Sequence, residues 1–99
     1  MEQFARITRM VGSSWIECLQ NKKVAVFGLG GVGSYVVEAL VRNGIGELVL
    51  VDHDIIDITN LNRQLYALHS TIGMNKVDVA RARCLDTVSY THLRAHETL

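Results

Sequence analysis

The residues from Val24 to Asp54 constrain the fold more than any other part of the chain. A short apolar run comes first, a segment with Gly28, Gly30 and Gly33 follows, and a second apolar run ends the stretch. Glycines in the spacing G-x-G-x-x-G, placed between a strand and a helix, are typical of a turn that holds a phosphate. Since two buried strands joined by a helix form a right-handed crossover, the stretch predicts a Rossmann-like βαβ unit with parallel strands.

Each glycine of this turn has an expected task. Gly28 allows the tight turn after the strand, Gly30 lets the backbone approach a phosphate, and Gly33 allows the helix to pack closely on the strand. An additional glycine, Gly31, extends the pattern. The N-terminus of the helix then offers free N–H groups and a partial positive charge to an anion.

Asp52 follows at the end of the second apolar run. A carboxylate at this place usually accepts hydrogen bonds from the hydroxyls of a ribose. A glycine turn without a ligand and a solvated strand-end aspartate are the alternatives, but the two features in this order favour a nucleotide site. For Asp54 and Asp57, the sequence favours no functional role over that of a solvated loop charge.

The expected secondary structure is of the α/β class. Strands are predicted over residues 24–27 and 48–51, and one or two N-terminal helices over residues 2–20, with a break near residues 12–14. The helix after the glycines ends near residues 43–44, and a further helix begins after Asn75 as its cap. The apolar faces expected for these two helices are Val32, Val36, Ala39 and Leu40 in the first, and Val77, Ala80, Cys84 and Leu85 in the second.

Length and composition limit the classes of protein. The chain has 99 residues, enough for one small domain, and is 48% hydrophobic and 20% charged, as globular proteins are. The formal net charge of zero excludes a bulk attraction to nucleic acid or membrane, although not a local basic patch. The longest apolar runs have strand length, so neither a membrane span nor a signal peptide is predicted. Cys18 and Cys84 form no C-x-x-C pair and are predicted to be small buried hydrophobes in the cytosol.

Basic residues follow the second strand, and they bear on the choice of nucleotide. Up to Asp54, NAD and ATP fit the residues equally well. The segment from Thr59 to Gln64 then brings Arg63 and several amides to the carboxyl edge of the sheet, and Lys76 adds a second cation. A triphosphate needs such cations, whereas the diphosphate of a dinucleotide usually needs only the helix end. Phosphate contact by these cations is therefore predicted, with an NAD-dependent oxidoreductase as the alternative.

Four motifs together resemble a known superfamily. They are GLGGVGS, LVDHD, TNLNRQ and the G-x-x-K that ends at Lys76. They look like the ubiquitin-activating-enzyme superfamily, which includes the bacterial adenylating enzymes of thiamine and molybdopterin synthesis. Within that group, GGVGSYVVEALVRNGIGELVLVDHD, NRQLYALHSTIG and an N-terminal F-x-R most resemble the tRNA threonylcarbamoyladenosine dehydratases. The resemblance covers about residues 3–86.

The resemblance implies roles for individual residues. Arg63 would hold phosphate and steady the charge that develops at the α-phosphate during reaction. Arg6 matches an N-terminal arginine that, in relatives, reaches into the ATP site of the partner subunit, although Gln3 stands where the family usually has another basic residue. The residues expected to bind ATP are Gly28, Gly30, Gly31, Gly33, Ser34, Asp52, Asn60, Arg63 and Lys76.

The resemblance also implies a reaction. A carboxylate would attack the α-phosphate of ATP, with Mg²⁺ assisting, to give an acyl-adenylate and pyrophosphate. In the dehydratases that carboxylate belongs to the threonylcarbamoyl group on a tRNA adenosine, and ring closure with loss of water follows. Adenylation of a sulfur-carrier protein is the alternative, since the residues seen here serve both acceptors. The expected enzyme is a cytoplasmic homodimer.

The last residues, VSYTHLRAHETL, follow neither a helical nor a strand period. His92 and His96 lie four apart, as in a helical metal pair, but no metal site is predicted there. The segment resembles a translated sequencing-adapter read-through. Residues 1–87 are therefore expected to be the N-terminal part of an ATP-binding adenylation domain, and residues 88–99 a non-native tail. The expected magnesium ligand and substrate region would lie beyond this truncated part, which would be inactive alone.

Overall fold

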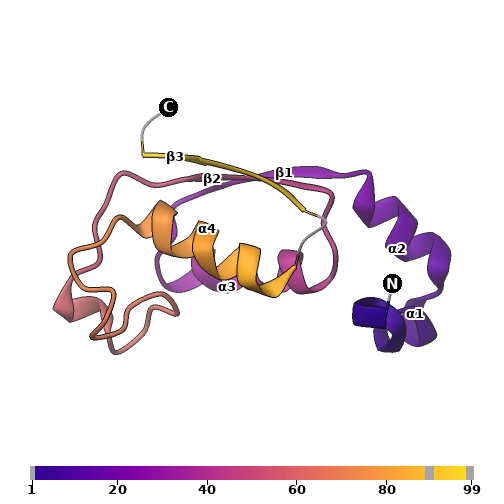
Figure 1. Cartoon of the computed structure of the whole chain (residues 1–99), viewed down its shortest axis with the longest axis horizontal. Coiled ribbons are helices and arrows are strands. Elements are labelled where there is room, and N and C mark those ends of the chain that lie inside the picture. Colours follow the sequence, from indigo (N-terminus) through magenta and orange to yellow (C-terminus); the bar gives the residue numbers. More distant parts are fainter. Residues whose placement is uncertain (1, 89–90, 98–99) are drawn as a thin grey trace.

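A parallel sheet with helices on one face organises the chain in the computed structural model, which describes residues 2–88 and 91–97 (Figure 1). The elements in chain order are the 3₁₀ helix η1 (Glu2–Phe4), α1 (Ala5–Val11), α2 (Ser13–Gln20), β1 (Lys23–Phe27), α3 (Gly31–Arg42), β2 (Glu47–Val51), the 3₁₀ helix η2 (Ile58–Asn60), α4 (Lys76–Thr87) and β3 (His92–His96). The predicted α/β class with N-terminal helices and a βαβ unit is confirmed.

The strands lie in the order β1-β2-β3, and both pairings are parallel. Phe27 pairs with Val51 at the end of β1 and β2, so the carboxyl ends of these strands meet at one edge of the sheet. The glycine turn leaves β1 at this edge, and Asp52 leaves β2 beside it. The sheet therefore brings the turn and the carboxylate together, as the sequence predicts.

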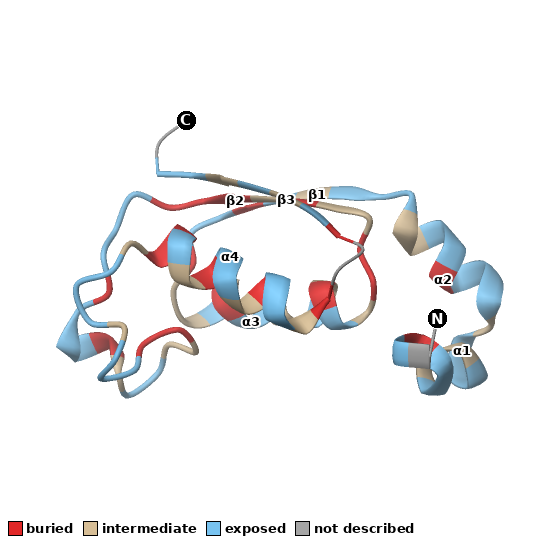
Figure 2. Cartoon of the chain, in the orientation of Figure 1, coloured by how far each residue is buried: buried red, intermediate tan, exposed pale blue. Residues whose placement is uncertain are grey.

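The core lies between the sheet and the helices α3 and α4, which cover the same face (Figures 1 and 2). Leu48 and Leu50 of β2 point into it and have no exposed surface, and Val37 of α3 is equally buried. On the opposite face, no helix of the described residues covers the strands, and Phe27 is 63% exposed. The described part of the chain therefore has helices on only one side of its sheet.

The inward face of α3 differs from the predicted one. Ser34, Val37 and Val41 are its buried residues, whereas Val32 is 80% exposed and Val36 is exposed. Apolar residues occur on nearly all sides of this helix, so their period alone does not fix its rotation. The rotation is set at Gly33, where a Cβ atom would collide with the carbonyl oxygen of Gly28. In α4 the predicted face is confirmed except for Leu85, which is exposed.

The N-terminal helices form as predicted and break at Gly12, which has a φ of +89°. They project from the end of the sheet opposite the carboxyl edge (Figure 1). Phe4 is fully buried against Gly44, where a Cβ would lie 3.1 Å from the phenyl ring. Cys84 is buried as predicted, but Cys18 is exposed, so the prediction for Cys18 is wrong. None of the helices in the described residues has the length and apolarity needed to cross a membrane.

The segment predicted as a read-through tail contains β3, which pairs with β2. Leu93 and Ala95 pack against the core, while His92 and His96 are exposed. Residues 89–90 and 98–99 of that segment lie outside the described residues. Strand formation has no bearing on how the segment arose, so its non-native origin stays a prediction.

Candidate functional site

The glycine turn joins β1 to α3 and has one side fixed by the fold. Gly28 has a φ of +92°, a backbone conformation that favours glycine, and its N–H donates to the carbonyl of Val51 at 2.8 Å. Gly33 packs against Gly28 so closely that no Cβ fits between them. Both glycines therefore have the structural tasks that the sequence predicts.

The other side of the turn is open. A Cβ at Gly30 would lie 3.5 Å from Nε2 of Gln64, and one at Gly31 would lie 3.9 Å from the carbonyl oxygen of Arg63. Both are ordinary van der Waals distances, and neither residue has a positive φ. The folded chain thus leaves room for a side chain at both positions, directly at the N-terminus of α3.

Ser34 faces the core rather than this open side. It is fully buried, and its hydroxyl donates to the carbonyl of Gly30 at 2.5 Å. The hydroxyl therefore holds the first turn of α3 in place. Its predicted contact with a nucleotide stays a prediction.

Asp52 links the glycine turn to the loop after β2. Only 9% of the residue is exposed, and Oδ2 accepts a hydrogen bond from the N–H of Leu29 at 2.6 Å. Oδ1 accepts from the N–H of Asp54 at 2.8 Å. Each carboxylate oxygen can accept a further hydrogen bond, so the group remains able to bind ribose hydroxyls.

Lys76 begins α4 and brings a buried cation to the same edge. Its side chain is 7% exposed, and Nζ lies 3.9 Å from Oδ2 of Asp54. The N–H of Lys76 also donates to the carbonyl of Asp54 at 3.1 Å. A buried ammonium is costly unless anions compensate it, and among the described residues this long ion pair leaves hydrogen-bonding capacity of Lys76 available for an anionic ligand.

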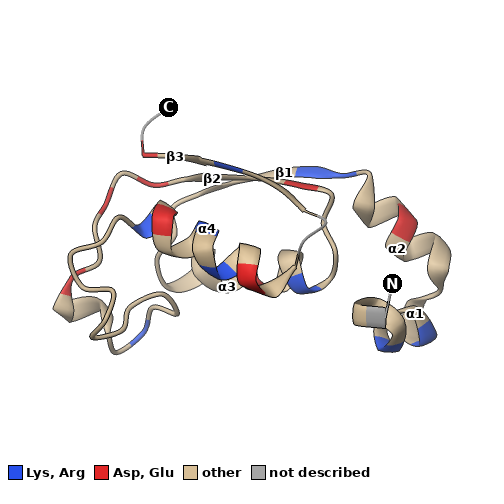
Figure 3. Cartoon of the chain, in the orientation of Figure 1, with Lys and Arg blue, Asp and Glu red and all other residues tan. Residues whose placement is uncertain are grey.

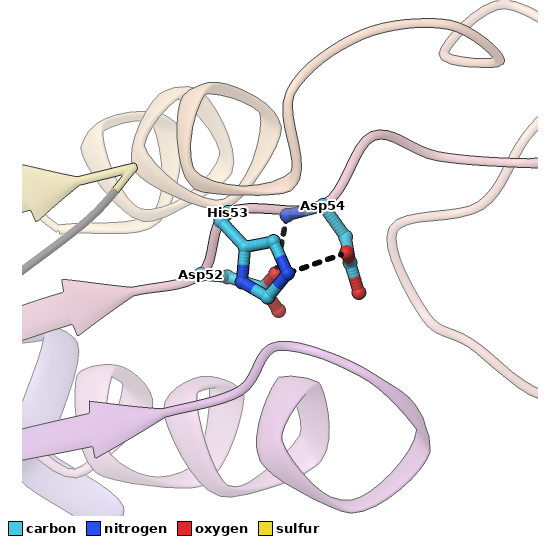
Figure 4. Close-up of side chains that lie close together, drawn as sticks. All are labelled: Asp52, His53 and Asp54. Atoms are coloured by element: carbon cyan, nitrogen blue, oxygen red, sulfur yellow. Dashed lines mark hydrogen bonds and ion pairs between the residues drawn. The ribbon is translucent and has the colours of Figure 1, made fainter.

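Three side chains at the end of β2 lie close together in Figure 4. The ligand atoms of Asp52, His53 and Asp54 all lie within 4.8 Å of one another, and Nε2 of His53 is 3.3 Å from Oδ1 of Asp54. Such a group has the donor types that metal ions use. Since Asp52 already accepts two backbone hydrogen bonds and the other two residues are exposed, the group alone does not establish a metal site.

Asn60 and Arg63 belong to the loop that follows. Asn60 is 8% exposed, and its Oδ1 accepts from the N–H of Asp57, which leaves the amide nitrogen to donate to a ligand. The Thr59 hydroxyl donates to the Asp57 carboxylate and holds its pKa below the usual value. Arg63 is exposed, and its guanidinium donates to the carbonyl of Thr59 and to Oδ1 of Asn62, both at 3.0 Å. The guanidinium therefore rests on its own loop.

A cavity of 420 Å³ opens at this edge, which is within the size range of small-molecule sites. Its lining residues are Phe27, Gly28, Val51, Asp52, His53, Asp54 and Glu97. Phe27 and His53 were not predicted as site residues. Their place at the carboxyl ends of β1 and β2 is the signal that could have found them.

Arg6 lies in α1, at the end of the molecule opposite this site (Figures 1 and 3). One chain therefore does not bring Arg6 together with Asp52 and Lys76. The remaining predicted residues gather around the carboxyl edge.

Two contacts join the elements that support the site: one links α3 to α4, and the other links the loop after β2 to α3. Glu38 of α3 binds Arg83 of α4 with hydrogen bonds of 2.8 and 3.1 Å, and these chiefly hold the Glu38 pKa below its usual value. Tyr66, which is 2% exposed, places its hydroxyl 3.5 Å from the carbonyl of Ser34. Burial raises the pKa of Tyr66, and it raises that of the neighbouring Cys84 thiol to about 11, so both groups stay neutral.

Comparisons with known proteins agree with this geometry. A tRNA threonylcarbamoyladenosine dehydratase of Bacillus subtilis is 52% identical over 86 residues, which make up 87% of this chain and 34% of the relative. Ubiquitin-like modifier-activating enzyme 5 of Caenorhabditis elegans is 49% identical over 65 residues, 66% of this chain and 15% of that protein. The solved structure of the Escherichia coli dehydratase in complex with ATP superposes with a TM-score of 0.95 at 32% identity.

That superposition covers 99% of this chain and 40% of the dehydratase. The chain thus spans about a third of the length of the curated dehydratases it matches. The sequence profile of the ThiF family matches residues 3–99, so the match includes both the glycine turn and the loop with Arg63. The chain therefore belongs to the ThiF family.

Proposed function

We propose that this chain carries the ATP-binding part of an enzyme that adenylates a carboxylate. The observation that carries the proposal is the open side of the glycine turn. Gly30 and Gly31 have no packing need for glycine, yet they stand at the N-terminus of α3. Glycine at such places lets a phosphate approach the backbone N–H groups at the positive end of the helix dipole.

The neighbouring charges favour a nucleotide triphosphate. Lys76 supplies a buried cation whose ion pair with Asp54 is long, and Arg63 is exposed on the loop that packs on the turn. Asp52 would accept the ribose hydroxyls, and Asn60 would donate to a phosphate. Arg63 would leave its loop to neutralise charge that develops at the α-phosphate, which is the kind of stabilisation that speeds phosphoryl chemistry most. Mg²⁺ would share the phosphate charge.

The most favoured acceptor is the threonylcarbamoyl carboxylate on a tRNA adenosine. Support comes from the dehydratases, which are similar over 87% of the chain in the Bacillus subtilis case. Attack of the carboxylate oxygen on the α-phosphate would form the acyl-adenylate and release pyrophosphate. Attack of a neighbouring nucleophile on that adenylate would then close a ring and release AMP, for a net loss of water. Similarity to ubiquitin-like modifier-activating enzyme 5 supports the alternative, adenylation of a sulfur-carrier protein.

The position of Arg6 supports a homodimer. Since α1 lies at the far end of the molecule, Arg6 would reach an ATP site only if that site belonged to a second copy. Arg6 would then add a catalytic positive charge from the partner subunit. The proposed enzyme would work in the cytoplasm, where tRNA and ATP are available.

A calorimetric titration tests the nucleotide directly. We expect ATP to bind this chain and NADH not to bind, because Lys76 and Arg63 provide positive charge for a triphosphate in addition to that of the N-terminus of α3. NADH binding without ATP binding would instead favour an oxidoreductase.

The role of Arg63 is tested by ATP–pyrophosphate exchange in a version extended to the length of the relatives. We expect Arg63→Ala to abolish exchange, since the charge at the α-phosphate would be left without its cation. Arg81→Ala, on the exposed side of α4, removes a matched charge away from the turn and should retain exchange. Full exchange in Arg63→Ala would contradict the assignment of Arg63 to the α-phosphate.

A further inference from the structure

Gln64 lies against the open side of the glycine turn, although the sequence did not single it out as a site residue. Its Nε2 is 3.5 Å, and its Cδ 3.9 Å, from the place where a Cβ of Gly30 would stand. The carbonyl oxygen of the preceding residue, Arg63, approaches Gly31 in the same way. The carboxamide therefore borders the space that the two glycines leave free.

The backbone holds Gln64 firmly at this place. Its N–H donates to the carbonyl of Asn60 at 3.0 Å, and its own carbonyl accepts from the N–H of Ala67 at 3.1 Å. Tyr66 and Ala67, which follow it, are buried in the core. Because the flanking chain is anchored on both sides, the side chain is presented to the turn without a loop rearrangement.

The carboxamide of Gln64 is also without a hydrogen-bond partner among the residues that the structure describes, although the residue is half-buried. The two other amides of this loop are engaged: Asn60 accepts from Asp57, and Asn62 accepts from Arg63. An amide has two N–H donors and one carbonyl acceptor. Since the described residues use none of them, the carboxamide of Gln64 remains available to bind a ligand.

We propose that Nε2 of Gln64 donates a hydrogen bond to an oxygen of the phosphate that sits on the Gly30–Gly31 turn. This inference rests on the proposed function, which puts a nucleotide there. A neutral donor adds no charge to the site. It fixes the orientation of the phosphate, while the helix N-terminus and Lys76 provide the positive potential. Gln64 is thus a nucleotide-binding residue whose contribution depends on the presence of a phosphate.

The test compares three ligands on two forms of the chain. The variant Gln64→Met keeps the length of the side chain and removes both donors, and calorimetry measures the binding of ATP, AMP and adenosine. We expect ATP and AMP to bind about tenfold more weakly to the variant, as for the loss of one hydrogen bond to a charged group, while adenosine binds as before. Gln64→Glu should weaken ATP and AMP binding further, since a carboxylate repels the phosphate.

The control is Asn43→Ala, which removes an amide whose Nδ2 donates to the carbonyl of Ala39 at the C-terminal end of α3, far from the turn. It should leave all three affinities unchanged. Thermal melting without ligand should show Gln64→Met and Gln64→Glu to be folded. Equal affinity of the unchanged chain and Gln64→Met for ATP overturns the inference, as does an equal loss for adenosine. If the unchanged chain binds no nucleotide, the proposed function itself fails, and the inference with it.

Discussion

The two sides of the glycine turn use the same amino acid for different physical reasons. On the packed side, Gly28 needs its positive φ, and Gly33 leaves no space for a Cβ atom. On the open side, Gly30 and Gly31 would meet only ordinary contacts if they carried one. The packed side needs glycine for the fold, whereas the open side leaves space beside the N-terminus of α3 that a ligand can occupy.

Within the six residues 28–33, the positions that matter for stability therefore differ from those that matter for ligand binding. A substitution on the packed side should unfold the chain, and one on the open side should spare the fold and remove the ligand. The following predictions test this difference by the change in the free energy of unfolding, beginning with the largest expected change.

Gly33→Ala is expected to have the largest effect. The new Cβ would collide with the carbonyl oxygen of Gly28, so α3 would have to move off the end of β1. Overpacking typically costs about 1–3 kcal/mol of the free energy of unfolding, and a collision with backbone atoms places this substitution at the upper end. Urea unfolding followed by circular dichroism measures it. Gly46→Ala would collide similarly with the carbonyl of Gln20, away from the turn, and serves as the matched comparison.

Asp52→Ala should come next. It removes two backbone hydrogen bonds to a buried carboxylate and leaves the N–H groups of Leu29 and Asp54 without their acceptor. We expect a loss of about 2 kcal/mol, together with weaker ATP binding, because the carboxylate serves both the turn and the ribose. Unchanged unfolding would show that the turn holds its shape without Asp52.

The ion pair between α3 and α4 should make stability depend on pH. Arg83 holds the pKa of Glu38 below its usual value of 4.5, so the pair contributes fully above that pH. The contribution is lost as the pH falls from about 4.5 through the lower pKa of the folded state. Urea unfolding between pH 7 and pH 3 should show this loss. Glu38→Gln should have a shallower decline over that window, and an equal decline would contradict the assignment.

Gly31→Ala should change stability least. The Cβ has room at the first residue of α3, and alanine favours a helix over glycine, so we expect a change within about 1 kcal/mol. ATP affinity should nevertheless fall at least about tenfold, because the Cβ would occupy the place of a phosphate oxygen. An unfolded variant, or one that binds ATP normally, would remove the distinction between the two sides.

Much of this arrangement was predictable, because local patterns determine it. The spacing of the glycines predicted the βαβ unit, and the order of strand and carboxylate predicted that Asp52 would stand beside the turn. The rotation of α3 was not predictable, since Val32 and Val36 are as apolar as the buried Val37. Only contact with β1 decides which of them faces inward.

Gln64 shows the same limit at the site. In the sequence it is one amide among several, and nothing in its spacing tells it from Asn60 or Asn62. Arg6 is the opposite case, since a motif singled it out and the fold places it far from the remaining site residues.

The sequence by itself determined the α/β class, the glycine turn, the acidic strand end and the membership of a family, because each is encoded by neighbouring residues. The tertiary structure alone decided which glycines serve the fold, which face of α3 is buried, and which amide of the loop meets the turn. These properties depend on how segments approach one another in space, whether they are close in the chain, as Gly28 and Gly33 are, or 23 residues apart, as Leu29 and Asp52 are. Packing between the segments sets these distances, and a local sequence pattern does not determine that packing.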